Sequence, residues 1–342
     1  MRTSTALLLT ISWTHLSSLA ADELPVEWIE PATGHKVIRL SREPGSASLY
    51  FHQHAYSADG GKLVITTPGG LSTVNLQTRE IQQIVQGRVG VLVTGRKSGQ
   101  IYYTRDGGVF ATDLDSLATR EVAQIPPGMG RGGSIAVNAD ETLLVGIATD
   151  PEGKARPRTP PSGGGGAGRL EPRWAAGTPM VLYTIDVKTG EVKKIYREHD
   201  WTNHLQCSPT DPDLIMFCHE GPWHYVDRIW TIRTDGTGLQ LMHKRAMDME
   251  IAGHEFFSAD GKTIWYDLQT PKSGVFWLAG VDLATGTRTR YHVERQDWSV
   301  HFNVSSDGKL FAGDGGGPSS VANRSADGRP LNPPGNGQWI YL

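Results

Sequence analysis

Three histidines stand at equivalent positions in successive copies of a repeated sequence pattern. His204, His254 and His301 each lie four residues before the small polar residue that opens a turn. Side chains of a strand alternate between its two faces, so equal offsets place these imidazoles at one height and on one face. Near pH 7 an imidazole can accept a proton or bind a metal ion. The spacing therefore predicts a functional site where the three copies meet.

More titratable groups are expected around these histidines. The second strand of each unit is antiparallel to the first, so His219 and Glu220 should emerge beside His204, and the loop after them carries His224 and Arg228. The remaining candidates at this face are Glu255, His52 and His54. Titratable groups that converge in a concave opening are the default hypothesis for a binding or active site. For any one histidine, the alternative is a purely structural role.

The elements that must position these residues form a strand–turn–strand repeat. Its copies are AYSADGGKLVIT (55–66), AVNADETLLVGI (136–147), QCSPTDPDLIMF (206–217), FFSADGKTIWY (256–266) and NVSSDGKLFAG (303–313). The first four copies are each followed by a third strand, a polar turn and a fourth strand. Four strands in about 40–50 residues are typical of a β-propeller blade. We therefore predict an all-β protein with the β-propeller architecture.

The repeat alone leaves two blade arrangements open. Six units begin near residues 50, 89, 130, 202, 252 and 299, and the sixth reaches only a third strand at 338–342. The segment 32–40 is typical of an outer strand without inner partners. Six blades closed irregularly, or a shortened seven-bladed ring, would fit this pattern. We favour the seven-bladed architecture with its last blade incomplete and six recognisable four-stranded repeats.

Composition and the N-terminus limit the class of protein. The net charge is −3, with 33 Lys and Arg against 36 Asp and Glu, so no nucleic-acid partner is indicated. Residues 1–20 have the charged start, apolar run and small-residue end of a signal peptide. We expect a single propeller domain over 21–342, periplasmic or secreted, with no membrane association after signal cleavage.

Two further features concern an insertion and the cysteines. A Pro- and Gly-rich insertion at 151–180 separates the second and third strands of the third unit, and its Arg173 or Arg169 could reach over one face. A surface loop without a role is the alternative. Cys207 and Cys218 lie on two strands of one hairpin, out of register with each other, so we predict two free, buried thiols.

Several strings resemble one known family. They are N-H-L-Q-C-S-P, F-C-H-E-G-P, V-D-R-I-W, G-H-E-F-F-S-A-D-G and G-D-G-G, all between Trp201 and Gly316. Together they resemble oligogalacturonate lyase, polysaccharide lyase family 22. F-C-H-E-G-P is the most specific of them. Weaker similarity covers most of the remaining chain after the signal segment.

The resemblance implies an activity and roles for the candidate residues. It implies a seven-bladed propeller that cleaves uronate oligomers, in pectin catabolism, by β-elimination with a histidine base and a metal ion, usually manganese. The base of the family falls on His204 and a metal-binding histidine on His254, and His301 also matches a family histidine. The family's remaining ligands lie in a last blade that this chain does not reach.

From the register and the resemblance together we assign the candidate site. His204 is the expected base, Arg228 or a metal ion neutralises the substrate carboxylate, and His219 or water protonates the leaving oxygen. His254 and His301 are the expected Mn²⁺ ligands. The expected substrate-binding residues are Glu220, Glu255, His52, His54 and Arg173. The alternatives are a non-catalytic binding or scaffold propeller, or a lyase for another uronate glycan. Self-association through open blade edges is also expected.

Overall fold

Repeated antiparallel sheets make up most of the protein. The computed structural model describes residues 25–31, 33–90, 92–129, 134–159, 170–315, 320, 323–324 and 329–330. The predicted signal peptide at 1–20 and the predicted strand at 338–342 lie outside these residues. Contacts divide the chain into two units, one up to Arg42 and one from Glu43 onward.

The first unit holds one small hairpin. Its strands are β1 (Glu27–Ile29) and β2 (Lys36–Ile38), which pair antiparallel. An outer blade strand was expected over 32–40. Among the residues that the structure describes, the strand in this segment, β2, pairs with β1 alone.

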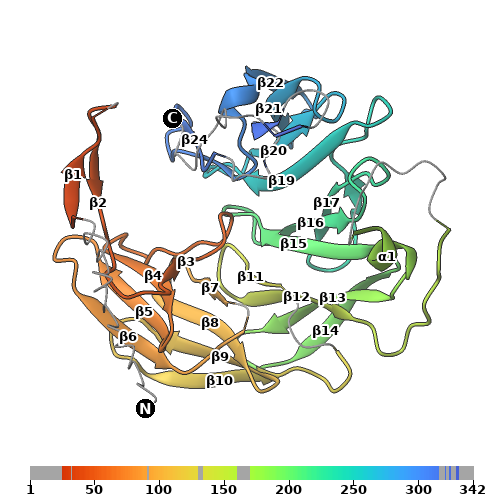
Figure 1. The fold of residues 1–342 in the computed structure, drawn as a ribbon. Coiled ribbons are helices and arrows are strands. Elements are labelled where there is room, and N and C mark those ends of the chain that lie inside the picture. The colour runs from red at the N-terminus through yellow and green to blue at the C-terminus, as the bar shows by residue number, and fades with distance from the viewer. Residues whose placement is uncertain are drawn as a thin grey trace, which may run out of the picture. The chain divides into compact units, whose positions relative to one another are not determined.

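The second unit contains five four-stranded sheets in chain order, and each strand pairs with the next one along the chain (Figure 1). We call them blades 1 to 5. Blade 1 consists of β3 (Ala47–Ser48), β4 (Lys62–Thr67), β5 (Gly70–Asn75) and β6 (Ile81–Gln86). Blade 2 consists of β7 (Leu92–Thr94), β8 (Gln100–Arg105), β9 (Gly108–Asp113) and β10 (Thr119–Gln124). Blade 3 consists of β11 (Ile135–Val137), β12 (Leu143–Thr149), β13 (Met180–Asp186) and β14 (Val192–Glu198).

Two blades and one smaller sheet follow. Blade 4 consists of β15 (Trp201–Cys207), β16 (Leu214–Glu220), β17 (Ile229–Arg233) and β18 (Gln240–Leu241). Blade 5 consists of β19 (Ile251–Phe257), β20 (Thr263–Gln269), β21 (Phe276–Asp282) and β22 (Arg288–Val293). After a short 3₁₀ helix (Arg295–Asp297), β23 (Phe302–Val304) and β24 (Phe311–Gly313) form a two-stranded sheet.

The predicted β-propeller class is confirmed, but the predicted number of blades is wrong. The structure has five four-stranded blades, where we expected six such repeats in a seven-bladed architecture. The sixth repeat has only its first two strands within the described residues. Its turn sequence resembles those of the complete blades, so the turn pattern alone could not distinguish a full blade from a single hairpin.

The repeated turn has a local physical cause. The side chain that opens it accepts a hydrogen bond from the backbone N–H five residues later, which holds the two strands in register. The bonds run from Lys62 to Ser57 Oγ, from Leu143 to Asn138 Oδ1, from Thr263 to Ser258 Oγ and from Leu310 to Ser305 Oγ, at 2.9–3.0 Å. In blade 4 the turn differs, because Ser208 Oγ accepts from the backbone N–H groups of Thr210 and Asp211.

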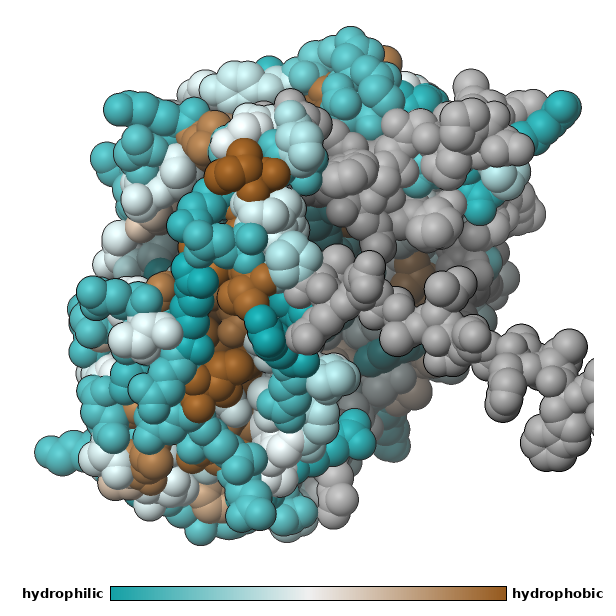
Figure 2. All heavy atoms as spheres, turned by 60° about the vertical axis from the view of Figure 1, so that its left-hand side comes forward, coloured by the Kyte–Doolittle hydropathy of each residue, from teal (hydrophilic) through white to brown (hydrophobic). Residues whose placement is uncertain are grey.

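The hydrophobic core lies between neighbouring blades. One buried cluster joins blades 1 and 2, another blades 2 and 3, and others join blades 3 and 4 and blades 4 and 5. Phe217, Ile147 and Leu182 belong to the cluster between blades 3 and 4. Hydrophilic side chains cover most of the face drawn in Figure 2, with apolar residues exposed in a narrow band. Each blade therefore depends on its neighbours for burial.

The insertion lies where it was predicted, between β12 and β13 of blade 3. It contains one short helix that was not expected, α1 (Leu170–Ala175). Both cysteines are free, as predicted, but only Cys218 is fully buried, because Cys207 lies at the end of β15. No helix in the described ranges is long and apolar enough to cross a membrane.

Candidate functional site

Matching bulges turn two of the predicted histidines out of their strands. The pairing of β15 with β16 shifts between Asn203 and Gln206, and the pairing of β19 with β20 shifts between Gly253 and Phe256. His204 lies within the first shift and has a φ of 48°, and His254 lies within the second with a φ of 44°. A residue other than glycine rarely adopts positive φ, and such strain concentrates at functional sites. The bulges re-aim both side chains.

The structure brings the three predicted histidines together. Ring centroids are 5.9 Å apart for His204 and His254, and 4.9 Å apart for His254 and His301. His52 joins them, with its ring 5.5 Å from that of His204. The hydroxyl of Tyr50, which was not predicted, lies 3.3 Å from Nε2 of His301. We call these four histidines and Tyr50 the axial cluster.

Two rings of the axial cluster are held by carboxylates, one buried and one exposed. Nδ1 of His254 lies 2.7 Å from Oδ1 of Asp267, and Nδ1 of His301 lies 2.5 Å from Oδ2 of Asp314. A proton on Nδ1 then leaves the lone pair on Nε2, which in His301 faces the hydroxyl of Tyr50 and in His254 can accept a proton or bind a metal. Neither aspartate was predicted, although Asp314 lies in the G-D-G-G string. Asp267 becomes a partner only through the pairing of β19 with β20.

His204 has two charged neighbours at its Nδ1 atom. Glu255 Oε1 lies at 3.5 Å and Arg228 Nη2 at 3.4 Å. Glu255 is fully buried, and its Oε1 has no hydrogen-bond partner. A proton on Nδ1 directed at this oxygen would satisfy it, since a buried unpaired acceptor costs about 1–3 kcal/mol. Because a guanidinium can only donate, Nδ1 either accepts from Arg228 Nη2 or, when protonated, donates to Glu255 Oε1. The second tautomer leaves the lone pair of His204 on Nε2.

Arg228 is enclosed between two carboxylates behind His204. Its Nη1 lies 2.8 Å from Glu220 Oε1 and its Nε lies 3.1 Å from Glu255 Oε2. Although burial alone would raise the pKa of Glu220, the charge of Arg228 holds it below its usual value. Only 3% of Arg228 is exposed. Arg228, expected to face the substrate, therefore supports Glu255 and His204 from behind, together with Glu220.

The environment keeps two histidines neutral. Burial, followed by the charge of Arg228, lowers the pKa of His204 to about 3. Burial, followed by His204, lowers the pKa of His52 to about 3 as well. For His254, burial would lower the pKa, but the carboxylate of Asp267 raises it above the ordinary value. Near pH 7, His204 is therefore available as a proton acceptor.

His219 does not lie where it was expected. Consecutive residues of a strand point to opposite faces, so His219 and Glu220 cannot both face His204. Nε2 of His219 lies 2.7 Å from Glu198 Oε2, and its ring packs on Trp230 with centroids 5.0 Å apart. It therefore faces blade 3, and Glu220 is the member of the pair that faces Arg228.

Three other predicted residues also lie outside the axial cluster. His54 packs near Tyr56, with centroids 6.1 Å apart, and burial followed by the charge of Arg96 lowers its pKa to about 4. Arg173, on α1, lies over the ring of Trp201 at 3.7 Å from its centroid. His224, in the loop after β16, is buried, and its Nε2 has no hydrogen-bond partner.

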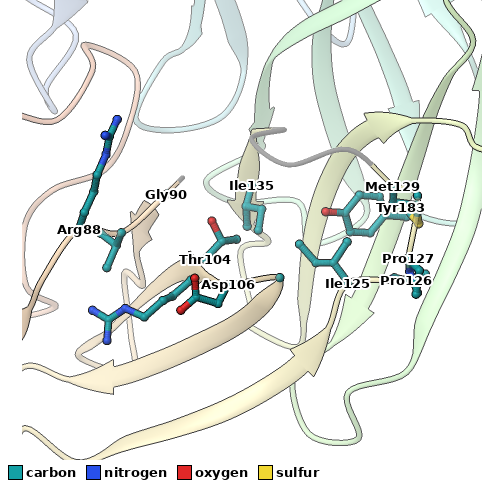
Figure 3. Close-up of a pocket in the computed structure, with 14 residues that line it drawn as sticks. Arg88, Gly90, Thr104, Asp106, Ile125, Pro126, Pro127, Met129, Ile135 and Tyr183 are labelled. Carbon is teal, nitrogen blue, oxygen red and sulfur yellow. The ribbon is translucent and has the colours of Figure 1, made fainter.

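A cavity of about 800 Å³ opens among the first strands of the blades. Its lining includes Tyr50, His52, His54, Arg96 and Gln206. A second cavity of about 930 Å³ lies between blades 2 and 3 and is lined by Arg88, Thr104, Asp106, Ile125 and Tyr183, among others (Figure 3). The second is larger but contains no residue of the axial cluster. Tyr50 and His52 of the axial cluster line the first cavity, and a smaller cavity of about 590 Å³ is lined by Tyr50, His301 and Asp314, among others. We therefore place the candidate site at the axial cluster, which these two cavities border.

Metal-ligand chemistry is possible at several places in the described chain. His254 and His301 have their Nδ1 atoms held by carboxylates, an arrangement that orients metal-binding histidines. Two groups have three ligand-type atoms close together, namely His204, Cys218 and Glu255, and Glu198, Asp200 and His219. Burial raises the pKa of Cys218 well above its usual value, which makes its thiol a poor ligand. The histidine pair therefore fits a divalent ion better than the group with Cys218.

Comparison with known proteins identifies the family of this chain. The family model described as oligogalacturonate lyase matches residues 26–331. A protein of Dickeya dadantii (strain 3937), named oligogalacturonate lyase, is 28% identical over 296 residues, covering 84% of this chain and 74% of its own. A protein of Pectobacterium atrosepticum, named oligogalacturonide lyase, is 26% identical with the same coverage.

Solved structures are similar over most of the fold. One, described as oligogalacturonate lyase in complex with manganese, has a TM-score of 0.74 at 26% identity and covers 86% of this chain and 78% of its own. An oligogalacturonate lyase from Vibrio parahaemolyticus has a TM-score of 0.73 at 23% identity, with 84% and 76% covered. At 23% identity, the similarity to the Vibrio parahaemolyticus structure supports the shared fold alone.

Proposed function

The chain belongs to the oligogalacturonate lyase family of pectin-degrading carbon–oxygen lyases, and on that premise we propose that it cleaves oligogalacturonate with His204 as the base. The observation that carries this proposal is the setting of His204 among the axial histidines, with Nδ1 facing the unpaired Glu255 Oε1. A periplasmic or secreted location, expected from residues 1–20, remains part of the proposal.

The reaction requires a base and a means of neutralising charge. β-Elimination removes the proton α to a uronate carboxylate and expels the oxygen on the next carbon. The carbon acid is weak, because its conjugate base adds negative charge beside an existing carboxylate. His204 takes the proton on Nε2, and the resulting imidazolium is stabilised by Glu255 at Nδ1. Such general-base assistance is typically worth about 10²–10⁴ in rate.

The departing oxygen also needs a proton. Because His219 faces Glu198, the donor is water or the hydroxyl of Tyr50. Burial raises the pKa of Tyr50 to about 12, so this hydroxyl stays protonated near pH 7. Its position beside His301 places it in the axial cluster.

A divalent ion is part of the proposal, supported by the manganese complex among the similar structures. His254 and His301 would hold it through Nε2, with Asp267 and Asp314 fixing the two rings. When bound, such an ion supplies a positive charge for the substrate carboxylate. Two imidazoles do not complete the coordination that Mn²⁺ prefers, so oxygen ligands must come from substrate, water or other residues.

Formation of unsaturated uronate tests the proposed base. His204→Ala should lower kcat/KM by about 10²–10⁴, because no other group in the cluster replaces the positioned acceptor. The absorbance of the unsaturated product gives the rate. His292→Ala, at an exposed position on the outer strand β22, is the matched control and should retain activity. Unchanged activity in His204→Ala would refute this role.

Further measurements test the metal ion and distinguish the alternative functions. Chelation should lower the rate and Mn²⁺ should restore it, if the ion contributes as proposed. Oligomers of other uronates distinguish a lyase for a different glycan. Binding of oligogalacturonate without any unsaturated product would instead identify a non-catalytic propeller.

A further inference from the structure

The helix in the insertion presents a free cation above blade 4. The guanidinium of Arg173 lies 3.7 Å from the ring centroid of Trp201. Arg173 is exposed, and no residue of the described chain forms an ion pair with it. Its orientation is set by stacking on an indole, while the edge of the guanidinium remains available to a ligand.

The helix is packed against the loop that follows β16. A Cβ atom added to Gly221 would lie 2.8 Å from Cδ1 of Trp174, so glycine allows this close approach. The ring of Trp174 also lies 5.9 Å from that of Tyr225. Arg158 lies over Trp174 and pairs with Asp200. In Figure 1, α1 accordingly lies beside β15 and β16.

These contacts place Arg173 over the start of β15, the strand that carries His204. Trp201 is three residues before His204 on β15, a distance of about 10 Å along a strand. Trp201 also pairs with Glu220, which contributes to the electrostatic environment of Arg173 and contacts Arg228 behind His204. A cation over Trp201 is therefore placed to reach a sugar further along the oligomer than the one that reacts at His204.

We propose that Arg173, stacked on Trp201, forms a carboxylate subsite for a sugar one place beyond the two that flank the scissile bond. This inference rests on the proposed function, since every sugar of oligogalacturonate carries a carboxylate. The planar guanidinium binds carboxylates through two parallel hydrogen bonds, and its stacked position reduces the entropy lost on binding. The subsite selects acidic oligomers over neutral ones and longer oligomers over the dimer.

The chain length of the substrate provides the test. Arg173→Gln should raise KM for tri- and tetragalacturonate about 10- to 100-fold, the effect of losing a charge-assisted bond. The kcat should change little, because the contact is equal in the ground state and the transition state. For digalacturonate, kcat/KM should remain that of the wild type. Arg173→Lys keeps the charge without the planar guanidinium. Its KM for tri- and tetragalacturonate should therefore lie between those of the wild type and Arg173→Gln.

A matched control and a binding measurement complete the design. Arg290→Gln removes the same charge from an exposed position on β22 and should match the wild type on every substrate. Unchanged kinetics of Arg173→Gln on tetragalacturonate, or an equal loss on the dimer, would overturn the subsite. If the wild type binds tetragalacturonate by calorimetry without cleaving it, the proposed function fails. Weaker binding by Arg173→Gln would then still support the subsite.

Discussion

At the residue scale, the axial cluster combines neutral imidazoles with buried charge. His204 and His52 have strongly lowered pKa values, while Arg228 and Glu255 are ionic neighbours within the same few ångströms. Removing one partner of such a buried ion pair lowers the free energy of unfolding by about 3–5 kcal/mol. His204 is thus an uncharged proton acceptor next to the buried, paired charges of Arg228 and Glu255.

The lowered pKa of His52 predicts a pH dependence of stability. Its pKa is about 3 in the folded protein and about 6.5 in the unfolded chain. Between these values the unfolded chain binds a proton that the folded protein does not, so stability falls as pH falls from 6.5 toward 3. In the wild type this proton uptake lowers the free energy of unfolding by up to about 1.4 kcal/mol per pH unit, and His52→Gln should not show this contribution.

Urea denaturation at several pH values from 7.5 to 4 measures this effect. The wild type should lose stability relative to His52→Gln as the pH falls, and the two should change in parallel above pH 7. His292→Gln serves as the exposed control. Parallel curves for wild type and His52→Gln across the whole range would contradict the prediction.

At the element scale, the two bulges and the inserted helix adapt a repeated blade to a particular site. The bulges occur at His204 and His254 in otherwise regular first strands. The α1 helix interrupts blade 3 but contacts blade 4 through Arg173 and Trp174. Local departures from the repeat therefore coincide with the residues to which we assign chemistry.

Trp174 should control how firmly the insertion is held. Trp174→Ala removes the contacts with Gly221, Tyr225 and Arg158, and we expect the insertion to open more easily by about 1–2 kcal/mol. Trypsin cleavage within 151–180 should then be about tenfold faster, because cleavage follows the open population. Trp223→Ala, at an exposed position in the neighbouring loop, should leave the rate unchanged. Equal rates for Trp174→Ala and the wild type would show that the packing does not hold the segment.

At the scale of the whole molecule, burial between blades makes stability a shared property. Phe217 has no exposed surface and packs in the cluster that joins blades 3 and 4. Neither blade can keep this apolar surface covered without the other. Self-association through open sheet edges remains a prediction, and sedimentation velocity over a range of concentrations tests it.

Phe217→Ala should destabilise the propeller as a unit. Truncation of a fully buried phenylalanine costs about 3–5 kcal/mol, and the loss should appear in a lower midpoint of urea unfolding. Leu239→Ala, which truncates a side chain that is 42% exposed, should change the midpoint little. A loss below about 1 kcal/mol in Phe217→Ala would indicate that the blades do not depend on this interface.

The amino-acid sequence by itself determined the propeller class and the common position of His204, His254 and His301. Both follow from local rules, because the turn side chains bond to nearby backbone and strands alternate with period two. Tertiary structure decided the number of complete blades, the partners Asp267 and Glu255, and the enclosure of Arg228. It also turned His219 toward Glu198. These features depend on bulges and on packing between blades, which join residues far apart in the chain and leave no fixed spacing in it.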